Sequence, residues 1–328
     1  MTVTDFPASN AKAMTQHDNG SPDSQLQEGG LIPGGEGQPA YVLHRPRALA
    51  IPVLIAVPHA GREYPLSLVN RMRHPGEAAP RLEDRYVDLV ARQVADATGA
   101  TLLVANAPRA MIDLNRSPED VDWDMITGPR TGFVRSRLAA GRRSRSGLGL
   151  VPRRLPGLGE LWRQPLPSAD LAKRIDQVHA PYHLALSHTL EALRDKWGGA
   201  LLLDVHSMPP LGPKTGEGAA VDFVIGDRFG ASCESNLVST ALDHFDAHGV
   251  RAAHNRPYAG GYVLDRHGAP ARGISAMQLE ICRATYLDRH LREPGDGVEP
   301  VGTILAALVR RLAEEVAKGA SGFAQAAE

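Results

Sequence analysis

The chain has 328 residues, and 43% of them are hydrophobic, which is enough for one large domain or two small ones with a substantial core. Its 36 basic and 37 acidic side chains leave a net charge of −1, so overall charge favours neither nucleic acid nor an anionic membrane as a partner. Two cysteines in no CxxC pattern, no basic-then-apolar N-terminus and no apolar run of about 20 residues predict a cytoplasmic protein without a membrane span.

The N-terminal part of the chain differs in composition from the rest. Residues 1–40 are rich in Ser, Gly, Asn, Gln and Pro, and we expect them to form a disordered tail before a single domain over 41–328. The apolar run 51–58 predicts a buried strand that ends at Pro58 and His59. The patterns that follow predict a helix over about 83–97, a strand over 101–105 and a short strand near 111–114.

A basic insertion, rich in Gly and Pro, interrupts this pattern at about 127–167. Such an insertion is either a lid or a surface excursion, and its arginines lack the interleaved aromatic residues of a nucleic-acid site. The remaining patterns predict a helix over 171–197 that bends at Pro181, a strand over 201–208, a strand over 220–225, a helix over 234–248, a strand over 274–281 and a helix over 301–318. This alternation predicts an α/β protein with a largely parallel sheet covered on both faces.

Polar side chains gather where these predicted strands end, which is where open α/β sheets bind ligands. Two histidines, several carboxylates and several arginines are found there, namely His59, Asp84, Arg109, Asn115, Arg116, Asp204, His206 and Glu280. Two His and a carboxylate are the usual protein ligands of a catalytic zinc ion, with a further carboxylate as base and an arginine for an oxyanion. The strand ends therefore match a metal-dependent hydrolase.

Each of these residues also has a structural interpretation. A histidine after a strand can be a capped loop residue, Asp84 can be a helix N-cap, and Glu280 can lie on the polar face of an edge strand. Ser207, directly after His206, suggests a serine hydrolase, but no Gly-x-Ser-x-Gly elbow surrounds it. These alternatives stay open on the residues alone.

Five motifs in order extend the pattern over about residues 50–318. They are Val57-Pro-His-Ala-Gly61, Ile112-Asp-Leu-Asn-Arg-Ser-Pro118, Asp204-Val-His-Ser207, Asn255-Arg-Pro-Tyr-Ala-Gly-Gly261 and Gln278-Leu-Glu-Ile281 with Tyr286 downstream. Together they resemble the N-formylglutamate amidohydrolase family. The resemblance implies a three-layer α/β/α sandwich with a mixed sheet, similar to zinc-dependent exopeptidases. It also implies hydrolysis of N-formyl-L-glutamate to formate and glutamate in histidine breakdown.

The resemblance also implies roles for individual residues. Zinc would be bound by His59, His206 and a carboxylate. The His-x-x-Glu spacing of a zinc carboxypeptidase is absent here, and Asp84, in a segment that resembles the family's helix start, is preferred over Glu63 and Glu83. Glu280 would be the base and Arg109 would stabilise the oxyanion, while Asp204 would orient an imidazole. The remaining residues would bind substrate: Asn115, Arg116, Asn255, Arg256, Gly260 and Gly261.

Two other functions remain open from the sequence. One is a metal-dependent deacylase or carboxypeptidase-like hydrolase that acts on another N-acyl amino acid, and the other is a non-catalytic relative that binds acidic small molecules. In each case the partner is a small molecule rather than nucleic acid or membrane, and homo-oligomer formation is left open.

Overall fold

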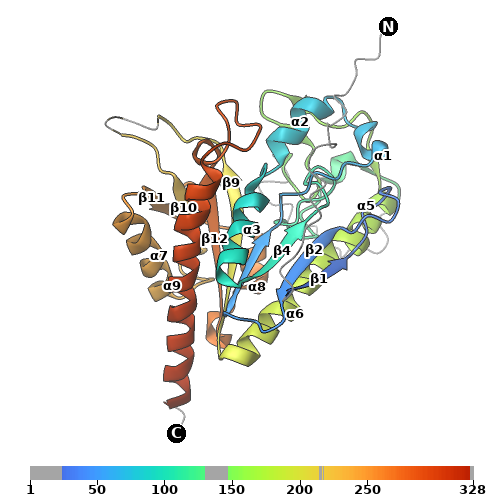
Figure 1. Cartoon of the computed structure of the whole chain (residues 1–328). Helices are drawn as coiled ribbons and strands as arrows, with labels where there is room; N and C mark the ends of the chain where they lie inside the picture. Colours follow the sequence, from blue (N-terminus) through green and yellow to red (C-terminus); the bar gives the residue numbers. More distant parts are fainter. Residues whose placement is uncertain (1–23, 130–146, 214–215, 217, 326–328) are drawn as a thin grey trace.

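The computed structural model describes residues 24–129, 147–213, 216 and 218–325, with side chains described to residue 319. Its centre is an eight-stranded mixed sheet (Figure 1). The strands lie side by side in the order β1 (Ser24–Gly29), β2 (Tyr41–Pro46), β4 (Thr101–Ala105), β3 (Val53–Val57), β9 (Ala200–Met208), β12 (Ile274–Cys282), β10 (Phe223–Gly226) and β11 (Ala252–His254). Strands β4, β3, β9 and β12 run parallel. Strands β1 and β2 pair antiparallel with their neighbours, and β10 pairs antiparallel with β12 but parallel with β11. The predicted mixed sheet is confirmed.

Helices cover both faces of the sheet. One face packs against α3 (Val87–Thr98), α7 (Ser235–Ala247) and α9 (Val298–Gln325), and the other against α6 (Ala180–Trp197) and α8 (Tyr262–His267). The shorter helices α1 (Leu66–Val69), α2 (Pro75–Leu82) and α5 (Ser168–Arg174) lie toward the end of the sheet where β9 and β4 finish (Figure 1). This arrangement is the three-layer α/β/α sandwich that the sequence predicted.

Alternation along the central strands explains why two cores form. Leu201, Leu203 and Val205 of β9 join one hydrophobic cluster, while Leu202 between them joins the other. Successive side chains of a strand point to opposite faces, so each strand of the parallel sheet needs apolar residues on both sides. Both of the helical layers are therefore held by the same nine-residue strand.

Several predicted boundaries need correction. The helix expected from residue 83 begins at Val87, because residues 83–86 form a turn, and α2 precedes that turn. Residues 111–114 form a loop instead of a strand, since the backbone N–H of Asp113 donates to Leu150 O and not to a neighbouring strand. The long helix over 171–197 is divided into α5, a π-helical turn at Ile175–His179 and α6. The wide turn lies directly before Pro181, whose ring removes a backbone donor.

The prediction that residues 1–40 form a disordered tail is wrong for residues 24–40. Strand β1 pairs along its whole length with β2, and beyond it Ile32 and Ala40 are buried. Backbone hydrogen bonds of an added edge strand, rather than many apolar side chains, order this segment. Residues 1–23 lie outside the described residues, so their predicted disorder stays a prediction.

The basic insertion is described only in part, because residues 130–146 lie outside the described residues. From residue 147 onward it packs on the protein through buried Leu150, Val151, Leu161 and Trp162. Short strand pairs organise this part, namely β5 (Ile126–Thr127) with β8 (Leu166–Pro167) and β6 (Arg154–Leu155) with β7 (Gly159–Glu160).

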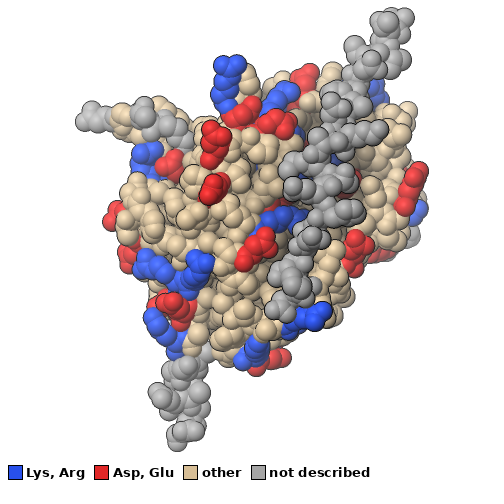
Figure 2. Space-filling view, in the orientation of Figure 1, with Lys and Arg blue, Asp and Glu red and all other residues tan. Residues whose placement is uncertain are grey.

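Charged side chains of both signs are interspersed on the face shown in Figure 2. Within the part of the chain that the structure describes, none of the helices combines the length and apolar character that crossing a membrane requires.

Candidate metal and substrate site

The polar residues of three neighbouring strands meet at the carboxyl end of the sheet. His59 follows β3 after Pro58, and Asp204 and His206 lie near the end of β9. In the parallel pairing of β9 with β12, Gln278 lies opposite Asp204 and Glu280 lies opposite His206. The register therefore places these side chains beside one another on one face of the sheet.

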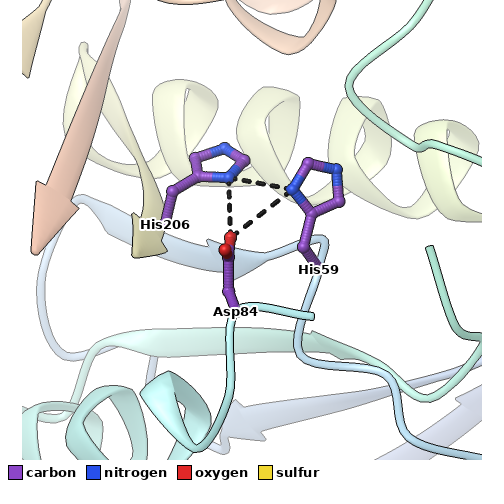
Figure 3. Close-up of side chains that lie close together, drawn as sticks. All are labelled: His59, Asp84 and His206. Atoms are coloured by element: carbon purple, nitrogen blue, oxygen red, sulfur yellow. Dashed lines mark hydrogen bonds and ion pairs between the residues drawn. The ribbon is translucent and has the colours of Figure 1, made fainter. Parts of the chain in front are cut away.

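Three buried groups converge there (Figure 3). His206 Nδ1 lies 3.1 Å from Asp84 Oδ2 and 3.1 Å from His59 Nδ1, and His59 Nδ1 lies 3.4 Å from the same carboxylate oxygen. A tetrahedral zinc ion with bonds of about 2.0–2.1 Å holds its ligands about 3.3 Å apart. The spacing of the three atoms fits such an ion.

Two further carboxylates fix the orientation of both imidazoles. His59 Nε2 donates to Asp113 Oδ1 at 2.7 Å, and His206 Nε2 donates to Asp204 Oδ2 at 2.9 Å. In the neutral ring the opposite nitrogen, Nδ1, is then a lone-pair acceptor. Each Nδ1 is thereby directed at Asp84. The sequence predicted an orienting role for Asp204, but it did not reveal the matching role of Asp113.

The electrostatics of the cluster favour a cation. Two Nδ1 lone pairs and a carboxylate oxygen face each other at 3.1–3.4 Å, which requires a positive charge among them, either an added proton or a metal ion. Burial lowers the pKa of His206, but the Asp204 and Asp84 carboxylates outweigh burial and raise it well above its usual value. Burial likewise opposes ionisation of Asp84, yet its contacts with His206 and His59 lower its pKa. The donor set thus fits a divalent metal.

The structure brings Asp84, rather than the two alternative carboxylates, to the histidines. Asp84 lies in the turn between α2 and α3, where its N–H donates to His59 O. Glu83 instead accepts from Arg85 at 2.8 Å, and Glu63 accepts from Gln38 at 3.2 Å. Helix α3 begins three residues after Asp84, with Tyr86 at its N-cap, so Asp84 does not cap it.

Glu280 lies inside the sheet. Its strand, β12, is flanked by β9 and β10, which rules out the edge-strand interpretation. Its Oε1 accepts from Gln278 Nε2 at 2.9 Å. Burial raises the pKa of Glu280 to about 7, with His206 and Arg109 opposing the rise and Asp84 and Asp204 adding to it. A carboxylate with such a pKa is suited to accept and return a proton at neutral pH.

A cavity of about 180 Å³ opens over these groups and is rich in cations. Arg109 binds the Asp113 carboxylate at 2.9 Å, and Arg116 donates to the carbonyl oxygens of Asn115 and Leu148. Two cavity arginines were not found from the sequence, Arg81 of α2 and Arg283 after β12. Neither belongs to a motif quoted above, so no pattern in the sequence indicated them.

The predicted substrate residues divide into two groups. Gly260 and Asn115 line the cavity, and Gly261 lies against Asn115, where an added Cβ would come within 2.6 Å of Asn115 Oδ1. Arg256 is exposed and does not line the cavity, and the side chain of Asn255 bonds to Asp227. The interpretation of these two as substrate ligands is therefore not supported by their positions.

Ser207 contributes to the cavity wall but is not arranged as a serine nucleophile. Its hydroxyl donates to Asp84 Oδ1 at 3.2 Å and accepts from Arg283 Nε at 3.0 Å. It therefore supports the carboxylate that faces the two histidines.

The fold and the site together are those of a hydrolase-like α/β protein with a candidate metal centre. One cavity of the α/β/α sandwich holds a buried His–Asp–His cluster, a carboxylate of raised pKa and several arginines. A comparison with family models matches residues 51–287 to the N-formylglutamate amidohydrolase family, and the chain belongs to that family. It is accordingly an enzyme of the amidohydrolase class, which acts on amide C–N bonds.

Individual relatives agree with this assignment. The N-formylglutamate deformylase of Pseudomonas putida is 30% identical over 269 residues, which cover 80% of this chain and 92% of the relative. The N-formylglutamate deformylase of Pseudomonas aeruginosa is 30% identical over 249 residues, 73% of this chain and 83% of the relative. The crystal structure of N-formylglutamate amidohydrolase from Ralstonia eutropha is 31% identical with a TM-score of 0.76, covering 85% of this chain and 99% of that one.

Proposed function

We propose that the protein hydrolyses N-formyl-L-glutamate to formate and L-glutamate, with one divalent metal ion, zinc, bound by His59, Asp84 and His206. Family membership and the names of the relatives support the reaction. One observation supports a metal-dependent reaction: two Nδ1 atoms and one carboxylate oxygen lie within 3.1–3.4 Å of each other.

The chemistry of a bound zinc ion is that of a Lewis acid, which makes water a stronger acid and a carbonyl carbon a better electrophile. Asp113 and Asp204 keep the imidazoles in the orientation that such an ion needs. These residues act before any substrate is bound, since their hydrogen bonds are already present.

Glu280 acts as the general base and then as the general acid. It takes one proton from the attacking water while the water oxygen bonds to the formyl carbon, and it returns that proton to the amide nitrogen as the C–N bond breaks. Its raised pKa supports both steps, because a carboxylate with a pKa of about 7 releases a proton more readily than an amine and accepts one more readily than an ordinary glutamate. Gln278 holds its side chain in place.

Arginines of the cavity stabilise the oxyanion and bind the two carboxylates of the substrate. Arg109 keeps its charge through Asp113 and lies where negative charge develops, so it stabilises the oxyanion. Arg116, with Asn115, binds a substrate carboxylate, and Arg81 and Arg283 add two cations to the same wall. A substrate with two negative charges matches this excess of guanidinium groups.

Metal dependence and substrate are tested together on the purified protein. The as-prepared, chelator-treated and zinc-reloaded forms are assayed with N-formyl, N-acetyl and N-succinyl derivatives of L-glutamate and with N-formyl-L-leucine. We expect about one ion per chain, loss of turnover after chelation, recovery with zinc, and the highest kcat/KM for N-formyl-L-glutamate. Undiminished turnover in protein depleted of metal would contradict the proposed role of the metal in hydrolysis. A higher kcat/KM for another derivative would show that N-formyl-L-glutamate is not the preferred substrate.

We also propose that the protein acts in histidine breakdown and is located in the cytoplasm. The products, formate and glutamate, are those of the family's reaction, and both Cys233 and Cys282 are buried as free thiols.

A further inference from the structure

A second cavity of about 230 Å³ lies between α1 and α5. These helices are neighbours at the right of the molecule in Figure 1. None of the described residues that line this second cavity lines the catalytic cavity. It is a separate feature, and it opens to the surface beside the exposed residues Ser67 and Lys173.

Arg174, on its wall, is a buried cation without a paired carboxylate. Only 5% of the residue is exposed, and its Nη1 donates to Met111 O at 2.7 Å while its guanidinium lies 5.7 Å from the ring of Trp162. Among the described residues Arg174 forms no ion pair, since Asp170 of the same helix pairs with Arg71 at 2.7 Å. Burial and the charge of Arg71 lower the pKa of Arg174 to about 10, and the charge of Asp170 opposes this only in part. Arginines this deeply buried are normally paired, because an unpaired buried charge is costly.

The charges around Arg174 favour a negative ligand. Among the residues that the structure describes, Arg71, Lys173 and Arg174 line the cavity together with one carboxylate, that of Asp170. Three cations facing one anion leave an excess of two positive charges. The donors of Arg174 other than the Nη1 proton given to Met111 O have no partner among the described residues, so they are free to bind an acceptor in the cavity.

We propose that this second cavity is a binding site for a small oxyanion, a carboxylate or a phosphate, with Arg174 as its buried anchor and Arg71 and Lys173 at its mouth. The planar guanidinium of Arg174 binds two oxygens of such a group, and the anion balances its buried charge. Inorganic phosphate and the two carboxylate products, glutamate and formate, are the sources with this chemistry.

Isothermal titration of the full-length, zinc-loaded protein with inorganic phosphate, and separately with L-glutamate and with formate, tests the site. Two substitutions address it: Arg174→Gln removes the anchor, and Lys173→Gln removes an exposed charge. Lys318→Gln is the matched control, since it removes a lysine from the exposed face of α9. Circular dichroism first establishes that each variant is folded.

We expect at least one of the three anions to bind, about tenfold or more weakly after Arg174→Gln, a few-fold more weakly after Lys173→Gln, and unchanged after Lys318→Gln. Whichever anion shows this pattern identifies the source. Absence of binding by all three anions would overturn the proposal. Binding that Lys173→Gln and Arg174→Gln leave unchanged would also overturn it, because the anion would then occupy another site, such as the catalytic cavity.

If Arg174→Gln does not fold, Lys173→Gln and Arg71→Gln decide the question by the same criterion. Both residues lie at the partly exposed mouth and both line the cavity.

Discussion

At the scale of single residues, the candidate metal site depends on carboxylates that do not face the metal position. Asp113 and Asp204 accept the Nε2 protons of His59 and His206, so each Nδ1 lone pair points at Asp84. Such partners set the tautomer and the basicity of a ligand imidazole. The proposed metal site therefore depends on five side chains and not three.

Asp113→Asn should weaken zinc binding roughly 10- to 100-fold, because an amide holds the His59 proton less strongly than a carboxylate does. Competition with a chromophoric chelator measures the affinity. Asp88→Asn is the control, since Asp88 is also a buried carboxylate and binds Arg62 at 2.8 Å away from the cluster. Equal zinc affinity in the wild-type and Asp113→Asn proteins would show that Asp113 has no such role.

Arg81 and Arg256 allow the substrate wall to be tested directly. Arg81 lines the cavity and Arg256 does not. We expect Arg81→Gln to raise KM for N-formyl-L-glutamate about tenfold through loss of a charge-assisted contact, and Arg256→Gln to leave KM within about twofold. Steady-state kinetics distinguishes the two, and the reverse order would restore the interpretation based on the Asn255–Gly261 motif.

At the scale of elements, a row of buried histidines from the π-helical turn, α6 and α8 bonds to the loop that carries the site. His179 Nε2 donates to Arg116 O at 2.9 Å and His183 Nε2 donates to Leu114 O at 3.0 Å. His183 Nδ1 then accepts from His267 Nε2 at 2.9 Å, which fixes the direction of each bond. The loop with Asp113, Asn115 and Arg116 is held from behind by neutral imidazoles.

This row predicts a loss of stability in weak acid. Burial lowers the pKa of His179 to about 4 and of His267 to about 3, and it also lowers that of His183. Unfolded histidines take up protons near pH 6.5, so between about pH 6.5 and 4 the unfolded state binds more protons and acid favours unfolding. His179 and His267 should each reduce the free energy of unfolding by about 2 kcal/mol between pH 7 and 4.5.

His267→Gln tests the contribution of one histidine, because Gln still donates to His183 but does not titrate. Urea unfolding at pH 7, 5.5 and 4.5, in constant excess of chelator so that metal binding does not contribute, should show a smaller dependence on pH than the wild-type protein. The same dependence in both proteins would mean that His267 is not a buried neutral group.

At the scale of the whole molecule, the pairing of the sheet's central strands brings the site residues together. The parallel register of β3, β9 and β12 brings His59, His206 and Glu280 together although they are far apart in the sequence. Hydrophobic runs that end in polar residues were sufficient to predict these strands and the polar side chains that meet at this end of the sheet. Asp113, Arg81 and Arg283 were missed because their roles depend on how two loops and the short helix α2 fold over the end of the sheet, which periodicity does not reveal. Strand β1 was missed because its sequence, Ser-Gln-Leu-Gln-Glu-Gly, forms an edge through backbone pairing alone.

The N-terminal edge predicts a difference between two truncated chains. A chain that begins at Ser24 keeps β1 and the buried Ile32, whereas a chain that begins at Tyr41 loses both and exposes the edge of β2. The shorter chain should be less stable by at least about 2 kcal/mol, from the apolar surface of Ile32 alone. Equal urea midpoints would show that this segment does not stabilise the sheet.

The assignment of Glu280 as the base of a metal-dependent hydrolysis is tested most directly by the Glu280→Gln variant. Its turnover and its metal content are measured on the same preparation. Gln keeps the shape of Glu280 but does not accept a proton, and Glu280 is not one of the three residues proposed to bind the metal. We expect about one zinc ion per chain, with turnover of N-formyl-L-glutamate reduced at least about 100-fold. Wild-type turnover in this variant would contradict the assignment of Glu280 as the base.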